Sequence, residues 1–144
     1  GQRIVIIADT GFWVALLDRR DTFHGLAYRR LKELDEPLLV TLPVVTETCH
    51  LLQKRVGNEK TLAFLRGHQR GVFQVFDLGE ADFPRILDLM RQYANLPMDF
   101  ADASLVILAE ALSHGRILST DQRDFQTYRW KNRHPFENLL LKSA

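Results

Sequence analysis

Four acidic residues of this chain stand at positions that can bring their side chains together. They are Asp9, Glu47, Asp102 and Asp121. Two carboxylates about 4 Å apart repel each other by roughly 4 kcal/mol at an effective dielectric constant near 20, so a cluster of three or four needs protons or a cation. Because the set offers oxygen ligands and no His or Cys at ligand spacing, it favours a hard divalent ion, Mg²⁺ or Mn²⁺.

A cation held by a few carboxylates keeps open coordination positions, and these allow hydrolysis. It can bind a phosphodiester oxygen, neutralise the charge that builds up there, and lower the pKa of a bound water. We expect Asp9 to be a direct ligand, followed by Asp102, with Asp121 binding directly or through water. Glu47 is expected to bind a second ion or to orient the attacking water. The acidic set therefore predicts phosphodiester hydrolysis.

Two of the carboxylates follow predicted strands. Residues 4–8 are apolar and mostly β-branched, which is typical of a buried strand, and Asp9 comes directly after them. A second short strand, predicted at 116–120, leads straight into Asp121. In parallel α/β sheets the carboxyl edge of the strands is where ligands bind. Both side chains are therefore expected at that edge.

Two predicted helices bring the other carboxylates to the same edge. A strand at 38–42 precedes a helix at 43–55, and Glu47 falls in the opening turns of that helix. Another helix begins near Asp99 and has Asp102 in its first turn. Since these two residues share a helical face, either could be the ligand; we interpret Asp99 as the helix cap.

The rest of the chain alternates in the same way. Further helices are predicted at 12–17, 23–34, 59–69 and 80–93, a third strand at 72–76, an edge strand in the tail around 139–141, and a helix stop at Gly115. Strands separated by helices imply right-handed crossovers and a three-layer α/β fold, with a mostly parallel central sheet of four to five strands and helices on both faces. A length of 144 residues predicts one domain, residues 1–144.

Composition narrows the setting in which the protein acts. Nineteen basic residues against eighteen acidic ones give a formal net charge of +1, so any affinity for nucleic acid must come from local placement of Arg and Lys. The single cysteine, Cys49, cannot form an internal disulfide, and no apolar run reaches the roughly 18 residues of a membrane span. We expect a cytoplasmic protein.

Four short motifs carry a resemblance to a known family. They are Ile7-Ala-Asp-Thr-Gly-Phe12, Val45-Thr-Glu-Thr48, Asp99-Phe-Ala-Asp-Ala-Ser-Leu105 and Ser119-Thr-Asp-Gln-Arg-Asp-Phe125. In order and spacing they resemble the motifs of PIN-domain ribonucleases, and the chain looks most like the toxin of VapBC-type toxin–antitoxin pairs. The resemblance covers essentially the whole chain and implies a PIN-like fold.

The resemblance implies roles for the same acidic residues. The acidic quartet of the family falls on Asp9, Glu47, Asp102 and Asp121, and the Asp-Ala pair at 102–103 favours Asp102 over Asp99 as the ligand. Residues implied in support are Thr10, Asp99, Thr120 and Asp124. The implied function is a Mg²⁺- or Mn²⁺-dependent endoribonuclease, with RNA as substrate, a cognate antitoxin as partner and a homodimer as its assembly.

Other interpretations remain open from the sequence. Arg123, two residues past Asp121, is our candidate for substrate binding, whereas most other Arg residues have the pattern of solvated surface charge. The alternatives are an RNA-processing nuclease of the same fold without an antitoxin, a catalytically inert binding module, and an aspartyl phosphotransferase of the haloacid-dehalogenase or receiver kind. The last is disfavoured because Gly11 stands where haloacid dehalogenases usually carry a second Asp.

Overall fold

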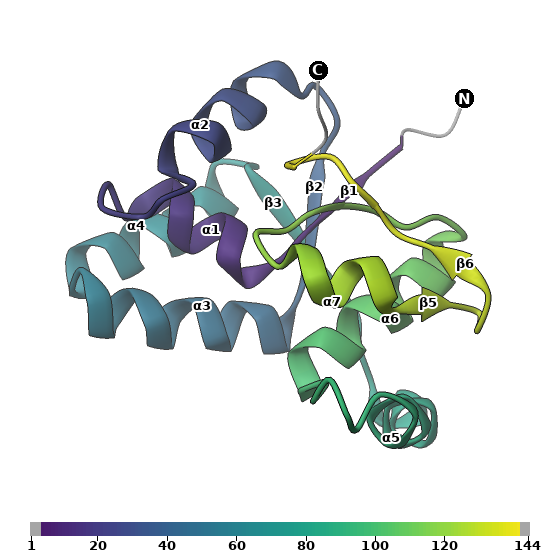
Figure 1. The fold of residues 1–144 in the computed structure, drawn as a ribbon. Helices are drawn as coiled ribbons and strands as arrows, with labels where there is room; N and C mark the ends of the chain where they lie inside the picture. Colours follow the sequence, from purple (N-terminus) through teal and green to yellow (C-terminus); the bar gives the residue numbers. More distant parts are fainter. Residues whose placement is uncertain (1–3, 142–144) are drawn as a thin grey trace.

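A parallel sheet forms the centre of the structure, a computed structural model that describes residues 4–141 (Figure 1). Its strands are β1 (Ile6–Ala8), β2 (Leu38–Thr41), β3 (Phe73–Phe76), β4 (Arg116–Leu118) and β7 (Glu137–Asn138). The spatial order is β3-β2-β1-β4-β7, and each neighbouring pair is parallel. The predicted parallel sheet is thereby confirmed, with β1 in the middle.

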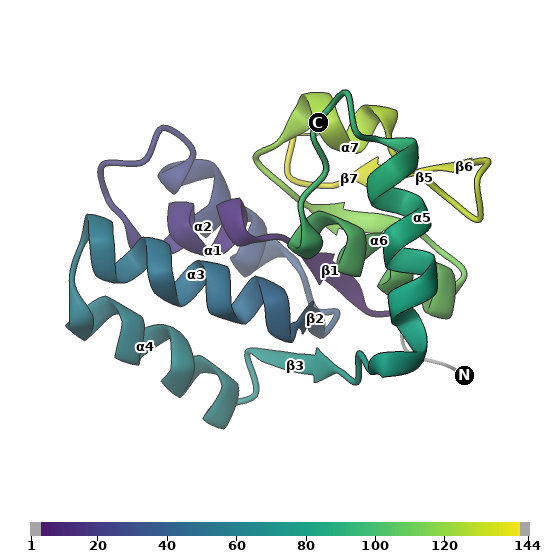
Figure 2. The same ribbon diagram turned by 90° about the horizontal axis from the view of Figure 1, so that it is seen from below.

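Helices cover both faces of the sheet. They are α1 (Thr10–Leu17), α2 (His24–Glu33), α3 (Leu42–Arg55), α4 (Asn58–Gln69), α5 (Phe83–Gln92), α6 (Phe100–Leu112) and α7 (Gln122–Thr127), with a 3₁₀ turn at Glu80–Asp82. Figure 2 shows α1 to α4 gathered on one side and α5 and α6 on the other. The three-layer α/β architecture is thus confirmed.

The most apolar elements lie in the middle of the molecule. All three residues of β1 are buried, as expected for a central parallel strand. Helix α6 is buried over nearly its whole length because its sequence is apolar on every side, and it lies between the sheet and α5. A hydrogen bond between the hydroxyls of Thr41 and Ser104, 2.7 Å apart, ties the start of this helix to the end of β2.

Aromatic packing joins the first helix to the far edge of the sheet. The Trp13 ring is almost fully buried and lies 5.5 Å from that of Phe64 and 5.1 Å from that of Phe73, measured between ring centroids. The Phe64 and Phe73 rings stack at 4.9 Å. These contacts hold α1, α4 and β3 together, and α1 carries the first acidic residue at its amino end.

The C-terminal part differs most from the sequence prediction. Residues 122–127 form helix α7, which the sequence prediction missed, and β5 (Arg129–Trp130) pairs with β6 (His134–Pro135) in a small antiparallel hairpin. The edge strand predicted around 139–141 is wrong in position: it lies at 137–138, because the Asn138 side chain accepts the N–H of Leu140 and turns the chain inwards.

Two boundaries also move. Strand β4 ends at Leu118, two residues earlier than predicted, because the side chain of Ser119 already takes part in the turn that follows. The predicted stop at Gly115 is wrong, since the left-handed residue that ends α6 is Ser113, with φ of 58°. Gly115 instead provides room for Trp130, whose Nε1 would lie 2.7 Å from an added Cβ.

In residues 4–141 we find no helix of the length and hydropathy needed to cross a bilayer.

Replacing Trp13 by Ala is expected to lower the free energy of unfolding by about 3–5 kcal/mol, because the ring's three aromatic neighbours would face a cavity. Urea denaturation measures this. Leu62→Ala on α4 is the control, since Leu62 is 45% exposed and its loss should cost under about 1 kcal/mol. Equal losses in the two variants would contradict this account of the core.

Candidate active site

One cleft at the carboxyl edge of the sheet contains every residue that the sequence analysis selected. Its volume is about 450 Å³. The selected residues that line it are Asp9, Thr10, Glu47, Asp99, Asp102, Thr120, Asp121, Arg123 and Asp124. They come from the ends of β1 and β4, from the second turn of α3 and from the starts of α1, α6 and α7, so the expected convergence is what the structure contains.

Asp9 occupies the deepest position of the acidic set. Its carboxylate accepts the backbone N–H of Thr10 at 2.7 Å and the hydroxyl of Ser119 at 2.9 Å, and it begins helix α1. Burial raises the pKa of Asp9 from 3.8 to about 7, against these two hydrogen bonds, and the charges of Glu47 and Asp121 raise it further. The fold thus buries the Asp9 carboxyl group where its charged form is unfavourable.

The loop after β4 is ordered by two residues to which the sequence analysis gave no role. The Ser119 hydroxyl accepts the backbone N–H of Asp121 at 2.9 Å while it donates to Asp9. The side chain of Asn138, on β7, accepts the Ser119 N–H at 3.2 Å and donates to the Ser119 carbonyl at 2.9 Å. The edge strand therefore fixes the turn that carries Asp121.

Asp121 itself begins helix α7. Its carboxylate accepts the backbone N–H of Asp124 at 3.1 Å. Burial raises its pKa, the Asp124 carboxyl group raises it further, and the charge of Arg123 lowers it. The Arg123 Nε lies 3.3 Å from the Asp124 carboxylate, and Arg123 is the one basic residue among those that line the cleft in the described part of the chain.

Asp102 and Asp99 take different positions on α6. Asp99 is the helix cap, as predicted, and its carboxylate accepts the N–H of Asp102 at 2.8 Å. The Asp102 carboxylate accepts the hydroxyl of Tyr128 at 3.1 Å. Burial raises the pKa of Asp102 to about 8, and the charges of Asp9 and Asp99 add to that shift. Tyr128, fully buried after α7, was missed by the sequence analysis.

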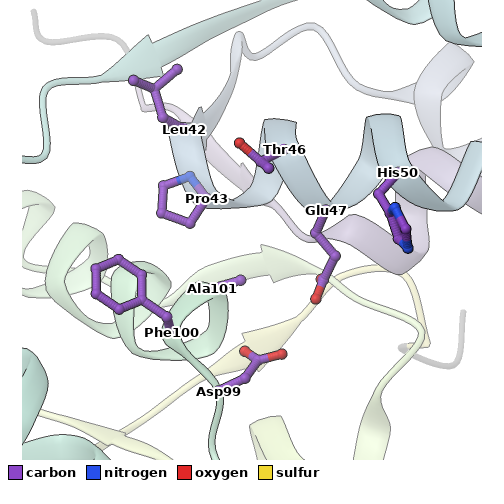
Figure 3. A pocket seen from close by; sticks show the side chains of 8 residues that line it. All are labelled: Leu42, Pro43, Thr46, Glu47, His50, Asp99, Phe100 and Ala101. Carbon is purple, nitrogen blue, oxygen red and sulfur yellow. The ribbon is translucent and has the colours of Figure 1, made fainter.

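Glu47 lies between this cleft and a larger groove of about 710 Å³ that runs beside it. Figure 3 shows the Glu47 and Asp99 side chains pointing toward each other from α3 and from the start of α6. Burial raises the pKa of Glu47, and the charge of Asp99 raises it further. The Thr10 hydroxyl lies close enough to favour the charged form, although it makes no hydrogen bond of ordinary geometry with any residue of the described range.

The donor set suits a hard dication, although its oxygens are not arranged around one. In residues 4–141, no three acidic, His or Cys side chains are placed so that they could hold an ion together. Oxygens of Asp9, Asp102 and Asp121 are instead bound to protein N–H and O–H donors. Oxygen ligands, raised pKa values and the buried, unpartnered Thr10 hydroxyl nevertheless fit a cation such as Mg²⁺.

Comparison with known families identifies the domain that carries this cleft. Residues 6–131 match the PIN domain family. The chain belongs to the PIN domain family. The matched residues include the whole acidic cleft and end just after Tyr128, whereas Asn138 on β7, which orders the Asp121 turn, lies beyond them.

Two known proteins are similar to this chain over most of its length. Ribonuclease VapC26 of Mycobacterium tuberculosis (strain ATCC 25618 / H37Rv) is 28% identical over 124 residues, which are 86% of this chain and 92% of the relative. The crystal structure of M. tuberculosis VapC20, described as a toxin that cleaves the sarcin–ricin loop, superposes with a TM-score of 0.76 at 22% identity. The matched residues make up 81% of this chain and 90% of the VapC20 chain. The structural likeness confirms the PIN-like fold.

Replacing Asp9 by Asn is expected to stabilise the metal-free protein. Since the folded-state pKa of Asp9 lies above its unfolded value, its ionisation opposes folding increasingly as the pH rises from about 4 to about 7, and fully above that. The amide oxygen can keep the hydrogen bond from the Thr10 N–H, and the amide N–H₂ can donate to the Ser119 hydroxyl in place of accepting from it. We expect a gain of at least about 1 kcal/mol at pH 8 and a smaller gain at pH 5, from urea denaturation in EDTA.

The control is Asp35→Asn, at an exposed position outside the cleft, which should change stability equally little at both pH values. A gain for Asp9→Asn that did not grow between pH 5 and pH 8 would show that Asp9 ionises normally in the folded protein.

Proposed function

We propose that the protein is a metal-dependent endoribonuclease that hydrolyses RNA phosphodiester bonds, and that it is the toxin of a toxin–antitoxin pair. One observation carries the proposal: carboxylates from four separate elements share one cleft, and all four have raised pKa values, two of them to about 7 and 8. PIN domain membership and the ribonuclease VapC26 support the reaction.

Asp9, Asp102 and Asp121 would hold Mg²⁺ or Mn²⁺, and Glu47 completes the set. When bound, the ion supplies charge neutralisation at the phosphate and acidifies water. Ser119 keeps one Asp9 oxygen oriented, and Tyr128 does the same for Asp102. Asp9 accepts one hydrogen bond at each oxygen and Asp102 accepts the Tyr128 hydroxyl at one oxygen, so lone pairs remain for an ion while these contacts hold the acidic side chains in place.

The remaining residues have supporting roles in the proposal. Glu47 lies at the rim of the cleft and has a raised pKa, which suits a group that accepts a proton from the attacking water. Arg123 can donate to the non-bridging oxygens of the phosphate that is cut. Thr10, Thr120, Asp99 and Asp124 line the cleft, and Asp99 also caps α6.

The setting is proposed from the relatives. VapC20 is described as a toxin, and the sequence motifs resemble those of toxins from toxin–antitoxin pairs, so we propose a cognate antitoxin as partner and the cytoplasm as location. We also propose a homodimer: Phe83 and Phe100 are partly exposed and in edge-to-face contact at 5.9 Å, and a second copy could cover them. An RNA-processing nuclease without an antitoxin would use the same cleft.

Asp9→Asn and Asp102→Asn are each expected to lower the rate of RNA cleavage by at least about a hundredfold, because each removes a charge from the metal-binding set. Cleavage of a long RNA in Mg²⁺ or Mn²⁺ is measured on gels, with circular dichroism to show that the fold is kept. Asp35→Asn is the charge-matched control and should cleave normally. Full activity in both cleft variants would refute the assignment.

Addition of Mn²⁺ is expected to raise the melting temperature of the native protein by several degrees, since an ion that binds only the folded state stabilises it. The increase should be largely lost in Asp102→Asn and kept in Asp35→Asn. This measurement needs no substrate, so it separates the metal site from the choice of RNA. The absence of any increase at millimolar Mn²⁺ would favour an inert binding module.

A further inference from the structure

A separate cavity, at the opposite ends of α1 and α3 from the carboxylates, is lined by basic side chains. Its volume is about 320 Å³. The residues that line it are Leu17, Asp18, Arg19, Arg20, Arg55, Val56 and Lys60. They come from the end of α1, the connection to α2, the end of α3 and the first turn of α4. None of these residues belongs to the acidic cleft.

The charges of this basic pocket are mostly unneutralised. Asp18 is buried, and its carboxylate is bound to the backbone N–H of Arg20 at 3.0 Å. Asp21 lies 3.9 Å from the Arg55 guanidinium, at the limit of an ion pair. Within the described range, the side chains of Arg19, Arg20 and Lys60 make no ion pair, and all three residues are exposed. The pocket thus has four cationic side chains against one buried carboxylate and one carboxylate at the limit of an ion pair, so it can bind an anion.

Two helices connect the basic pocket to the acidic cleft. Asp9 caps the start of helix α1 and Asp18 caps its end, and α3 carries Glu47 near its start and Arg55 at its end. These helices pack side by side, and Figure 1 shows the α1–α2 connection and the α3–α4 turn at the same end. At 1.5 Å per residue the two sites lie about 12–14 Å apart along the helices.

We propose that this basic pocket binds a backbone phosphate of the RNA, several nucleotides away from the one that is cut. The inference rests on the proposed function. The acidic cleft repels RNA wherever a metal ion does not neutralise it, so the affinity for the strand must come from other surfaces. A separation of about 12–14 Å corresponds to about four nucleotides at 3.4 Å each along a stacked strand. The pocket is therefore within reach of a strand whose phosphate occupies the cleft.

The guanidinium groups suit this ligand better than the ammonium group alone would. Arg presents planar N–H donors that match phosphate oxygens, and Arg19 and Arg20 lie on a connection, where their side chains can follow a backbone without base contacts. The amino end of α4, which carries Lys60, adds a favourable field for an anion. The pocket is therefore expected to contribute affinity for any sequence rather than to select a base.

The test uses fluorescein-labelled dodecauridylate and fluorescence anisotropy in Mg²⁺, with Asp9→Asn as the parent to prevent cleavage. Adding Arg19→Ala with Arg20→Ala should weaken binding at least about tenfold at about 0.1 M salt and flatten the slope of log affinity against log salt by about 1.4, the amount for two phosphate contacts on a single strand. Arg19→Lys with Arg20→Lys should keep most of the affinity.

Arg29→Ala with Arg91→Ala is the matched control, since both residues are exposed, lie on α2 and α5, and are absent from the basic pocket. Equal weakening in this control would overturn the proposal, because only net charge would then matter. Unchanged RNA binding with lost antitoxin binding would assign the pocket to a protein partner and also overturn it. Lys60→Gln provides a second variant if the double change fails to fold.

The ribonuclease function and the role of the basic pocket can be tested separately. If the parent protein binds no RNA and the native protein cleaves none, the proposed function is wrong and this inference falls with it. If RNA is bound and cleaved normally while Arg19→Ala with Arg20→Ala has no effect, only the basic pocket is wrongly assigned.

Discussion

The central feature of the structure is the electrostatic repulsion between its four clustered carboxylates, which the protein alone does not relieve. Parallel strands β1 and β4 end side by side, and the turns that follow them deliver Asp9 and Asp121 to one place, while the amino ends of α3 and α6 bring Glu47 and Asp102 to it. Burial and like charge make ionisation of these groups unfavourable. Such an arrangement lowers the stability of the metal-free protein, and in the proposed function a hard dication would bind there and offset that cost.

The scaffold around the site keeps the carboxylates from separating. Ser119 connects Asp9 to the Asp121 turn, and Asn138 connects that turn to the edge strand. On the other side, Tyr128 holds Asp102 while the buried core behind it fixes α6. Because these contacts use hydroxyl and amide groups, they orient the acidic side chains without neutralising them. The basic pocket at the far ends of α1 and α3 gives the same two helices opposite charge at their two ends.

Local sequence patterns predict the four strands β1 to β4 and the convergence of the acidic residues, but neither the position of the edge strand nor the contacts that hold the acidic residues in place. Residues 4–8 and Asp9 read as a buried strand with an acidic turn because apolar runs and their ends are local features, and the same holds for the Asp99 cap. Ser119 and Asn138 lie 19 residues apart, and Asp102 and Tyr128 lie 26 apart, so no window along the chain connects them. Helix α7 is a single polar-faced segment of six residues, too short for a periodic pattern to identify.

The most direct test of this account is a ¹³C NMR titration of the Asp side-chain carboxyl carbons, first without divalent metal and then in Mg²⁺. The account predicts that Asp9 and Asp102 titrate near pH 7 and 8 in the metal-free protein, and that Mg²⁺ moves both titrations several units lower. If both carboxyl groups titrated near pH 4 without metal and Mg²⁺ changed neither, the acidic cleft would not be the centre described above.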